Sequence, residues 1–552
     1  MSFNLAEINE AIAAAIPQRE CIVCGDRRLT WDEFNTRTRQ LGNYLRSRGL
    51  GCHRERPSVR NFESGQDHLG IYLYNCPEYL EAMMGAYKAR VAPFNVNYRY
   101  LDDELIYLLN DADARGLIYQ ARLAPSLERI RLRLPNLDVL IQVADDSGHG
   151  LLPGAVDYEE ALQLSSPQRP PLTWSPDDLY ILYTGGTTGM PKGVLWRQED
   201  IFFGALGGHP LGGEKFGSME AVVEMAKAGS LRALPAPPFM HGASHWAAFI
   251  TLHSGGTVVI QRQTDRLDPD DIWSTIEREK IMFLIIVGDA FGRPLLDQLD
   301  VKSYDLSSLG VLLSGGAILT PGIKDAFLER IPHLMIVDGF GSSESGAQGT
   351  EISTAGSKAR SGSFRMNEQT VVLNEDFSGV IEPGSPASGW VARTQHVPLG
   401  YFKDAEKTAR TFPVLNTQRY AVPGDHAMIT QDGKIVVLGR GSVSINSGGE
   451  KIYPEEVEMA LKHHPSVYDA VVVGTPNPRF GEQVTAIVQL RDGEAPSRDN
   501  LIELAAQRLA RYKLPRAIVF VAEMVRSPAG KADYRWARDM ACKELGIEES
   551  EG

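Results

Sequence analysis

A loop rich in glycine and threonine, followed by one lysine, is the segment best suited to hold phosphate groups. It reads YTGGTTGMPKG over residues 183–193 and comes at the end of an apolar, strand-like run. Glycines let main-chain N–H groups approach an anion, threonines add hydroxyl donors, and a lysine adds positive charge. The candidate phosphate-binding residues are Thr184, Gly185, Gly186, Thr187, Thr188 and Lys192.

The loop does not fit the Walker A motif, which requires G-x-x-x-x-G-K-[ST]. Counting on from Gly186, the position of the second glycine is occupied by Pro191. A Gly-rich stretch by itself is also typical of a surface turn. Other motifs must therefore decide between a phosphate site and a turn.

A second motif follows Phe340, where the chain reads Gly341-Ser342-Ser343-Glu344. Together with the loop it resembles the adenylate-forming superfamily, which contains acyl-CoA synthetases, luciferases and the adenylation domains of peptide synthetases. The resemblance implies that the Phe340 ring stacks on the adenine of ATP. It also implies that Glu344, assisted by Thr184, binds Mg²⁺, for which carboxylate oxygen is a suitable ligand. The other residues implied at the ATP site are Gly315, Gly316, Ala317, Gly341, Ser342 and Ser343.

Three charged residues follow in the order of the family. Asp425 and Arg440 match the aspartate and the arginine that the resemblance places at the ribose of ATP, where a carboxylate can accept hydrogen bonds from two hydroxyls. Lys531, in RSPAGKADY, matches the catalytic lysine, which neutralises charge between the incoming carboxylate and the α-phosphate. The resemblance covers nearly the whole chain.

The acceptor and the acid are also indicated by resemblance. The segment Ser447, Gly448 and Gly449 resembles the loop beside the thiol channel, so CoA is the expected acceptor. His241 resembles the histidine that gates or lines the acyl site, and we count it with Lys531 as catalytic. Gly242 stands where relatives that activate amino acids generally carry an aspartate, which argues against an amino acid. Gly242 and Gly288 are the candidate acyl-pocket residues.

These features predict an ATP-, Mg²⁺- and CoA-dependent acyl-CoA synthetase that forms an acyl-adenylate. Sequence segments such as SPAGKADYRWAR resemble those of actinobacterial synthetases for fatty acids or steroid side-chain acids. A long-chain fatty acid or a steroid side-chain acid is therefore the expected substrate. Three alternatives stay open. They are a ligase that loads a carrier protein, a luciferase-like oxygenase, and a scaffold that kept only the fold.

The chain departs from the family pattern at three places. Position 442, two residues after Arg440, is a serine where a charged hinge residue is common. The phosphate loop has Thr-Gly-Gly where a further hydroxyl residue is usual. Residues 51–68 look like an insertion without an evident function.

Composition agrees with a multi-subdomain enzyme of 552 residues. The net charge of −14 argues against a nucleic-acid partner, which would require a basic surface. Five cysteines without a second Cys-x-x-Cys pair predict reduced thiols. We find no signal peptide or membrane-spanning run, so we expect a cytoplasmic protein, with peripheral membrane contact and a homodimer left open.

The alternation of short β-branched runs with helical stretches predicts an α/β fold. We expect a large layered N-terminal adenylate-forming domain over residues 1–440, which binds ATP and the acid. A small mobile α+β C-terminal domain over residues 441–552 would carry Lys531, with a hinge at Gly441-Ser442.

Overall fold

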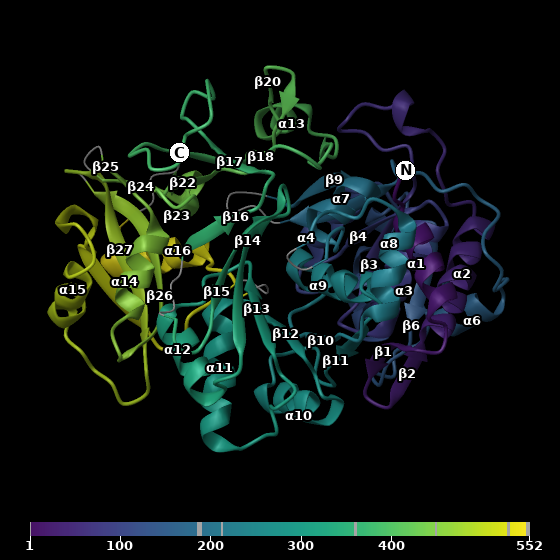
Figure 1. Cartoon of the computed structure of the whole chain (residues 1–552), viewed down its shortest axis with the longest axis horizontal. Coiled ribbons are helices and arrows are strands. Elements are labelled where there is room, and N and C mark those ends of the chain that lie inside the picture. The colour runs from purple at the N-terminus through teal and green to yellow at the C-terminus, as the bar shows by residue number, and fades with distance from the viewer. Residues whose placement is uncertain are drawn as a thin grey trace.

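The computed structural model describes residues 2–184, 190–210, 213–357, 362–447, 450–477, 479–526 and 530–547, with the backbone alone at Arg440, Ser442 and Lys451. Over these residues the chain forms a large layered α/β part and a small unit of strands and helices at the C-terminal end (Figure 1). The predicted fold class is confirmed.

One parallel sheet lies in the N-terminal half, with the strand order β4-β3-β5-β6-β7. All its pairings are parallel, and β3 and β6 are buried along their whole length. Burial on both faces is expected of parallel strands with helices on either side. The bounds are β3 His68–Tyr72, β4 Ala92–Asn95, β5 Ala114–Gln120, β6 Val139–Val143 and β7 Ala155–Asp157.

The second large sheet has thirteen strands within the described residues, in the order β17-β18-β22-β23-β16-β15-β14-β13-β12-β10-β11-β1-β2. It is parallel from β1 to β14, so β10, β12, β13 and β14 end at one edge; beyond β14 it is antiparallel. Ligands bind at the carboxyl ends of such parallel strands. The bounds are β1 Glu20–Cys24, β2 Arg27–Thr30, β10 Arg232–Pro235, β11 Thr257–Ile260, β12 Phe283–Ile286, β13 Val311–Gly315, β14 Met335–Ser342, β15 Gly346–Ser353, β16 Ser363–Met366, β17 Thr370–Leu373, β18 Ser388–Arg393, β22 Asp425–Ile429 and β23 Lys434–Arg440.

A three-stranded antiparallel sheet, β19-β9-β8, contains the two strands that precede and follow the predicted phosphate loop in the sequence. It consists of β8 Leu179–Thr184, β9 Lys192–Arg197 and β19 Gly400–Tyr401. Strands β8 and β9 pair from Leu179 opposite Arg197 to Thr184 opposite Lys192. The loop is therefore the connection of a hairpin. A further small hairpin joins β20 Val414–Leu415 to β21 Gln418–Arg419.

Local signals set the ends of the helices. At the start of α2, the Thr30 hydroxyl accepts from the N–H of Glu33 and the Glu33 carboxylate accepts from the N–H of Thr30, which is a capping box. The helices of the large part are α1 Leu5–Ala15, α2 Trp31–Ser47, α3 Pro77–Lys88, α4 Asp102–Asp111, α5 Ala124–Ile130, α6 Tyr158–Gln163, α7 Gln198–Ala205, α8 Met219–Ala228, α9 Gly242–His253, α10 Pro269–Glu279, α11 Gly288–Val301, α12 Pro321–Arg330 and α13 Ala405–Thr411.

The C-terminal unit has its own sheet and its own apolar cores. Helix α16 begins after Asp533, whose carboxylate accepts from the N–H of Trp536, and ends at Gly546 with φ +65°. Figure 1 shows this unit at one end of the molecule, beside α11 and α12. Its elements are β24 Ile445–Ser447, β25 Glu450–Ile452, β26 Val467–Asn477, β27 Gly481–Leu490, β28 Ala517–Val521, α14 Pro454–Lys462, α15 Arg498–Ala506 and α16 Tyr534–Leu545.

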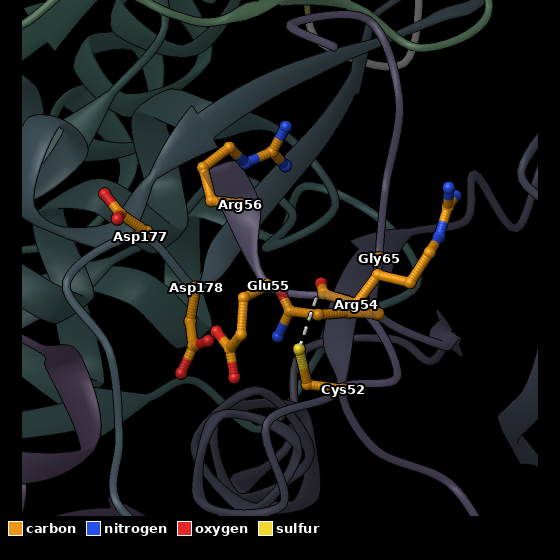
Figure 2. A pocket seen from close by; sticks show the side chains of 8 residues that line it. Cys52, Arg54, Glu55, Arg56, Gly65, Asp177 and Asp178 are labelled. Carbon is orange, nitrogen blue, oxygen red and sulfur yellow. Dashed lines mark hydrogen bonds between the residues drawn. The ribbon is translucent and has the colours of Figure 1, made fainter. Parts of the chain in front are cut away.

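The segment 51–68 folds back on itself: Cys52 and Gln66 form an antiparallel bridge, and the Phe62 carbonyl accepts from the N–H of Lys403. Figure 2 shows the small pocket beneath it, whose volume of about 10 Å³ is room for one water molecule. The segment thus attaches to the chain just after β19. The pocket is lined by Cys52, Arg54, Glu55, Arg56, Gly65, Gln66, Asp177 and Asp178.

The five cysteines form no disulfide bonds, and Cys21 and Cys542 are buried while the others are partly buried. Burial raises the pKa of the Cys21 thiol well above its usual value. Among the helices that the structure describes, none is long and apolar enough to span a bilayer.

Candidate active site

Thr184 ends β8 and Lys192 begins β9, on either side of the predicted phosphate loop, and the two residues lie opposite each other in the hairpin. The Lys192 ammonium is 3.7 Å from the Asp404 carboxylate. Burial alone would lower the pKa of Lys192, but the nearby Tyr107 and Asp111 outweigh it and raise that pKa. A cation therefore stands at the base of the loop. The predicted phosphate contacts Gly185, Gly186, Thr187 and Thr188 lie outside the described residues.

Glu344 lies in the tight turn between β14 and β15. Its backbone N–H donates to the Ser342 hydroxyl, 3.2 Å away, and the Trp196 indole N–H donates to the Ser343 carbonyl, 2.9 Å away. The Tyr401 hydroxyl donates to Oε1 of Glu344 at 2.9 Å. These contacts fix one carboxylate oxygen, and its position next to the phosphate hairpin suits a Mg²⁺ ligand.

Two residues near Glu344 were not predicted. Tyr401 lies in β19, and the ammonium of Lys407 in α13 stands 4.2 Å from the centre of the Tyr401 ring. Burial lowers the pKa of Lys407, while the charge of Glu344 opposes this shift and that of Lys192 adds to it. A second lysine therefore lies near the predicted phosphate site. No motif marks these residues, because β19 is brought to the site by pairing with β9.

The predicted adenine segment lies at the carboxyl edge of the parallel strands. Gly315 ends β13 opposite Gly339 of β14, and Gly316 follows with φ +87°. Phe340 stacks on Phe364 of β16, with ring centroids 5.2 Å apart and planes at 26°. One face of the Phe340 ring is therefore covered by Phe364, and this stacking holds the ring in a fixed plane. Ala317 packs on the core around Trp273.

Gly341 is fixed by its surroundings, since a Cβ there would stand 2.2 Å from the Gly346 carbonyl oxygen. Arg393 stabilises the turn that carries Glu344. Its side chain is buried, at 1% exposure, and donates to the carbonyls of Ser345 and Ala347. Arg393 is another residue that the motifs did not reveal.

Asp425 and Arg440 lie opposite each other at the start of β22 and the end of β23. Asp425 is 6% exposed. The backbone after Arg440 returns to this point, because the N–H of Gly441 donates to the Gly424 carbonyl at 3.0 Å. The two residues predicted at the ribose are thus neighbours, although the side chain of Arg440 lies outside the described structure.

Lys531 comes from the C-terminal unit and reaches the carboxyl edge of β13. Its Cε stands 3.6 Å from the position of a Cβ on Gly316. Burial, and then the charge of the nearby Lys531, lower the pKa of His241 to about 3. His241 Nε2 is buried and makes no hydrogen bond within the described residues. A neutral imidazole and a lysine therefore meet beside the predicted adenine segment.

The two glycines predicted in the acyl pocket have close neighbours. A Cβ on Gly242 would stand 3.0 Å from Leu182 and 3.3 Å from the Trp246 ring. A Cβ on Gly288 would stand 2.5 Å from the carbonyl oxygen of Ile318, at a residue with φ +54°. Gly288 is therefore required by local packing, and a side chain there would disturb the fold before it reached any acid.

Ser447, the described residue of the segment predicted at the thiol channel, is not brought to this site. Ser447 pairs with Glu450 and Gly481 in the sheet of the C-terminal unit, and Gly448 and Gly449 lie outside the described residues. Figure 1 shows β24 and β25 well to the side of β13. The structure thus joins Lys531, and not Ser447, to the predicted nucleotide site.

Comparison with known proteins gives two family matches. The family described as AMP-binding enzyme matches residues 10–402, and the AMP-binding enzyme C-terminal domain matches residues 456–531. The medium-chain acyl-CoA ligase Mig of Mycobacterium avium is 52% identical over 542 residues, which is 98% of each chain. The 3-oxocholest-4-en-26-oate–CoA ligase of Rhodococcus rhodochrous is 43% identical over 98% of this chain and 96% of its own.

Solved structures are similar at lower identity. The anthranilate CoA ligase AuaEII with anthranoyl-AMP superposes with a TM-score of 0.82 at 22% identity, over 99% of this chain and 98% of that one. A fatty acyl CoA synthetase of Mycobacterium tuberculosis superposes with a TM-score of 0.70 at 22% identity, over 98% and 99%. At this identity the likeness supports the fold.

Proposed function

The chain belongs to the AMP-binding enzyme family, and we propose that it is an acyl-CoA ligase that activates a carboxylic acid with ATP and transfers the acyl group to CoA. The observation that carries the proposal is the position of Lys531, beside Gly316 and His241 at the carboxyl edge of the sheet. ATP and CoA are the substrates expected of relatives that are named acyl-CoA ligases.

In the first half-reaction, a carboxylate oxygen of the acid attacks the α-phosphorus of ATP. The bond from that phosphorus to the bridging oxygen breaks, and pyrophosphate leaves with the electron pair. Two anions meet in this step, so a cation between them lowers the barrier. We assign that charge to Lys531, and Lys192 and Lys407 are our candidates for holding the β- and γ-phosphates.

The donors at the phosphate site fit a magnesium ion. Glu344 offers a carboxylate whose orientation is fixed by Tyr401, and Thr184 offers a hydroxyl at the end of β8. Mg²⁺ usually binds through one or two protein oxygens together with substrate phosphates, and when bound it would neutralise charge on them. We assign Glu344 and Thr184 as the residues that would hold it.

At the ribose, Asp425 would accept hydrogen bonds from the two hydroxyls, with Arg440 beside it. The adenine would lie between the segment Gly315–Ala317 and the ring of Phe340, with Gly341, Ser342 and Ser343 forming the turn next to it. These contacts are the same in the ground state and in the transition state, so they bind ATP without accelerating the step.

In the second half-reaction, the CoA thiol loses its proton to solvent and its sulfur attacks the acyl carbon. The bond from that carbon to the phosphate oxygen breaks, and AMP leaves with the electron pair. The segment from Ser447 to Gly449 is our candidate for the thiol channel, and Ser447 lies away from the site in the present arrangement. We therefore infer a rotation of the C-terminal unit between the two steps, about a hinge at Gly441-Ser442, with the domains divided at residues 440 and 441.

We infer an apolar acid as the substrate, either a fatty acid of medium to long chain or a steroid side-chain acid. Relatives at 52% and 43% identity are named for a medium-chain acyl group and a steroid acid. Gly242 and the neutral His241 offer no charge to hold a substrate ammonium. Each methylene buried in an apolar pocket adds roughly 0.8 kcal/mol, so affinity should rise with chain length.

The test is a panel of acids that includes acetate, benzoate, an amino acid, octanoate, palmitate and a steroid side-chain acid. Pyrophosphate release is measured with ATP, and AMP release is measured with and without CoA. We expect long or polycyclic acids to react best, with CoA required for turnover. If acyl-AMP forms but CoA does not accelerate its release, a carrier-protein ligase is favoured. Oxygen-dependent light emission with a luciferin would favour an oxygenase.

A further inference from the structure

A line of charged groups joins the large part of the molecule to the loop that carries Lys531. It begins at Asp289, in the first turn of α11, and continues through Lys462 at the end of α14 to Asp469 of β26 and Arg526. All four side chains are at most 15% exposed. This buried line lies outside the residues that the family motifs single out.

Asp289 is the member on the large part. Its Oδ1 accepts from the N–H of Thr320 at 2.8 Å, whereas its buried Oδ2 makes no hydrogen bond within the described residues. The nearest cation is Lys462 of the C-terminal unit, whose Nζ is 3.8 Å from that oxygen. A buried carboxylate oxygen needs a compensating charge, so the present contact between the large part and the C-terminal unit depends on Lys462.

Lys462 also holds the next member of the line. Its Nζ lies 3.1 Å from Oδ1 of Asp469, and Arg526 binds both oxygens of the same carboxylate at 2.6 Å. Burial would raise the pKa of Asp469, but the charges of Lys462 and Arg526 outweigh it and hold that pKa well below its usual range. The bidentate pair fixes the guanidinium plane of Arg526.

Arg526 ends the line at the catalytic loop. Its Nη1 donates to the carbonyl of Gly530 at 3.1 Å, one residue before Lys531. Gly530 itself packs on α11: a Cβ there would stand 3.3 Å from Ala290 and 3.4 Å from Val287. The same helix that carries Asp289 therefore also receives the residue next to Lys531.

We propose that Lys462 is a positioning residue for the first half-reaction: by pairing with Asp289 when the units close, it sets the Asp469–Arg526 pair that aligns Lys531. The inference rests on the proposed function. Lys462 touches neither ATP nor the acid, so it acts through Arg526 and the Gly530 carbonyl. When the unit rotates for the second half-reaction, the contact with Asp289 is broken and Lys462 is no longer needed.

The experiment measures the two half-reactions separately in the full chain, with dodecanoate as the acid. Acyl-AMP formation is followed as pyrophosphate release without CoA, and thioester formation is followed from preformed dodecanoyl-AMP and CoA. We expect Lys462→Ala and Asp289→Asn each to slow the first step on the order of tenfold or more, with the KM for ATP unchanged. Lys462→Arg should restore most of the rate, and the second step should stay at the parent rate.

The double variant should be no slower than the slower single variant, because both changes remove one contact. The matched control is Lys513→Ala, which removes a lysine paired with Glu456 at 2.6 Å inside the C-terminal unit and should leave acyl-AMP formation unchanged. Equal loss of both steps, or full additivity of the two changes, would overturn the inference. A parent enzyme that forms no acyl-AMP from any acid would instead overturn the proposed function.

Discussion

Lys531 lies beside Gly316, with its Cε 3.6 Å from where a Cβ on that glycine would stand. The two residues are 215 positions apart in the sequence, and the contact joins the C-terminal unit to the carboxyl edge of the large sheet. It brings a positive charge to the predicted adenine segment. On the proposed function, this is the arrangement in which the acid would be activated.

Glu344→Gln should raise the Mg²⁺ concentration needed for half-maximal pyrophosphate release and lower the maximal rate, because a neutral amide is a weaker ligand for a hard cation. Tyr401→Phe should shift the Mg²⁺ requirement in the same direction by about fivefold or less, since it removes one hydrogen bond to Glu344. A Mg²⁺ titration of both variants checks this. An unchanged titration for Glu344→Gln would place the metal elsewhere.

Asp425→Ala should raise the KM for ATP by about tenfold or more and change kcat little, because it removes contacts that bind both ground and transition states. Steady-state kinetics with ATP as the varied substrate measure it. Asp432→Ala, in the exposed turn between the same two strands, is the control and should behave as the parent. If Asp425→Ala left the KM for ATP unchanged, Asp425 would not hold the ribose.

Gly315, in the predicted adenine segment, is also expected to leave room beside the adenylate for the acid, and a Cβ there would meet its nearest atom, the Gly339 carbonyl oxygen, only at 3.7 Å. Gly315→Leu should lower the rate with palmitate or a steroid acid more than with butyrate. Gly288→Ala should instead lower the melting temperature and affect all acids alike, because its φ is +54° and a Cβ would overlap Ile318. Chain-length profiles and thermal unfolding of both variants separate the two effects.

Stability should fall as the pH drops from 7.5 to 5, in part through His253. Burial lowers the pKa of His253 to about 4, so the folded state keeps this imidazole neutral while the unfolded chain protonates it near pH 6.5. The stability it contributes is full above pH 6.5 and is lost as the pH falls toward 4. Between pH 7.5 and pH 5 the free energy of unfolding should fall by about 2 kcal/mol through this group.

His253→Asn should keep a donor for the Leu206 carbonyl, which Nδ1 contacts at 2.6 Å, and remove the titration. Urea unfolding at pH 7.5 and pH 5 should therefore show a smaller pH dependence in the variant. An identical pH dependence in the two proteins would contradict the burial of a neutral imidazole.

The clustering of several candidate site residues could be predicted from the sequence, because their motifs follow strands. Gly315 ends β13 and Phe340 lies near the end of β14, and parallel strands bring such ends together. Asp425 and Arg440 are neighbours because a short hairpin joins their strands.

Tyr401, Lys407 and Arg393 could not be predicted, because they reach the site through pairing of β19 with β9 and of β18 with β17 and β22, and no local pattern records such pairing. The packing of Gly288 against Ile318 was also hidden, since a glycine gives no sign of which atoms approach it. The position of Lys462 beside Asp289 depends on how the two units close.

The most direct test of the account is Lys531→Ala assayed in the two half-reactions with dodecanoate, beside the parent enzyme. The account predicts that the barrier to acyl-AMP formation rises by on the order of 3 kcal/mol, because the charge between the carboxylate and the α-phosphate is lost. The rate of this step should therefore fall about a hundredfold or more. Thioester formation from preformed dodecanoyl-AMP and CoA should proceed at the parent rate. Equal loss of both steps, or no loss of the first, would contradict the role of Lys531.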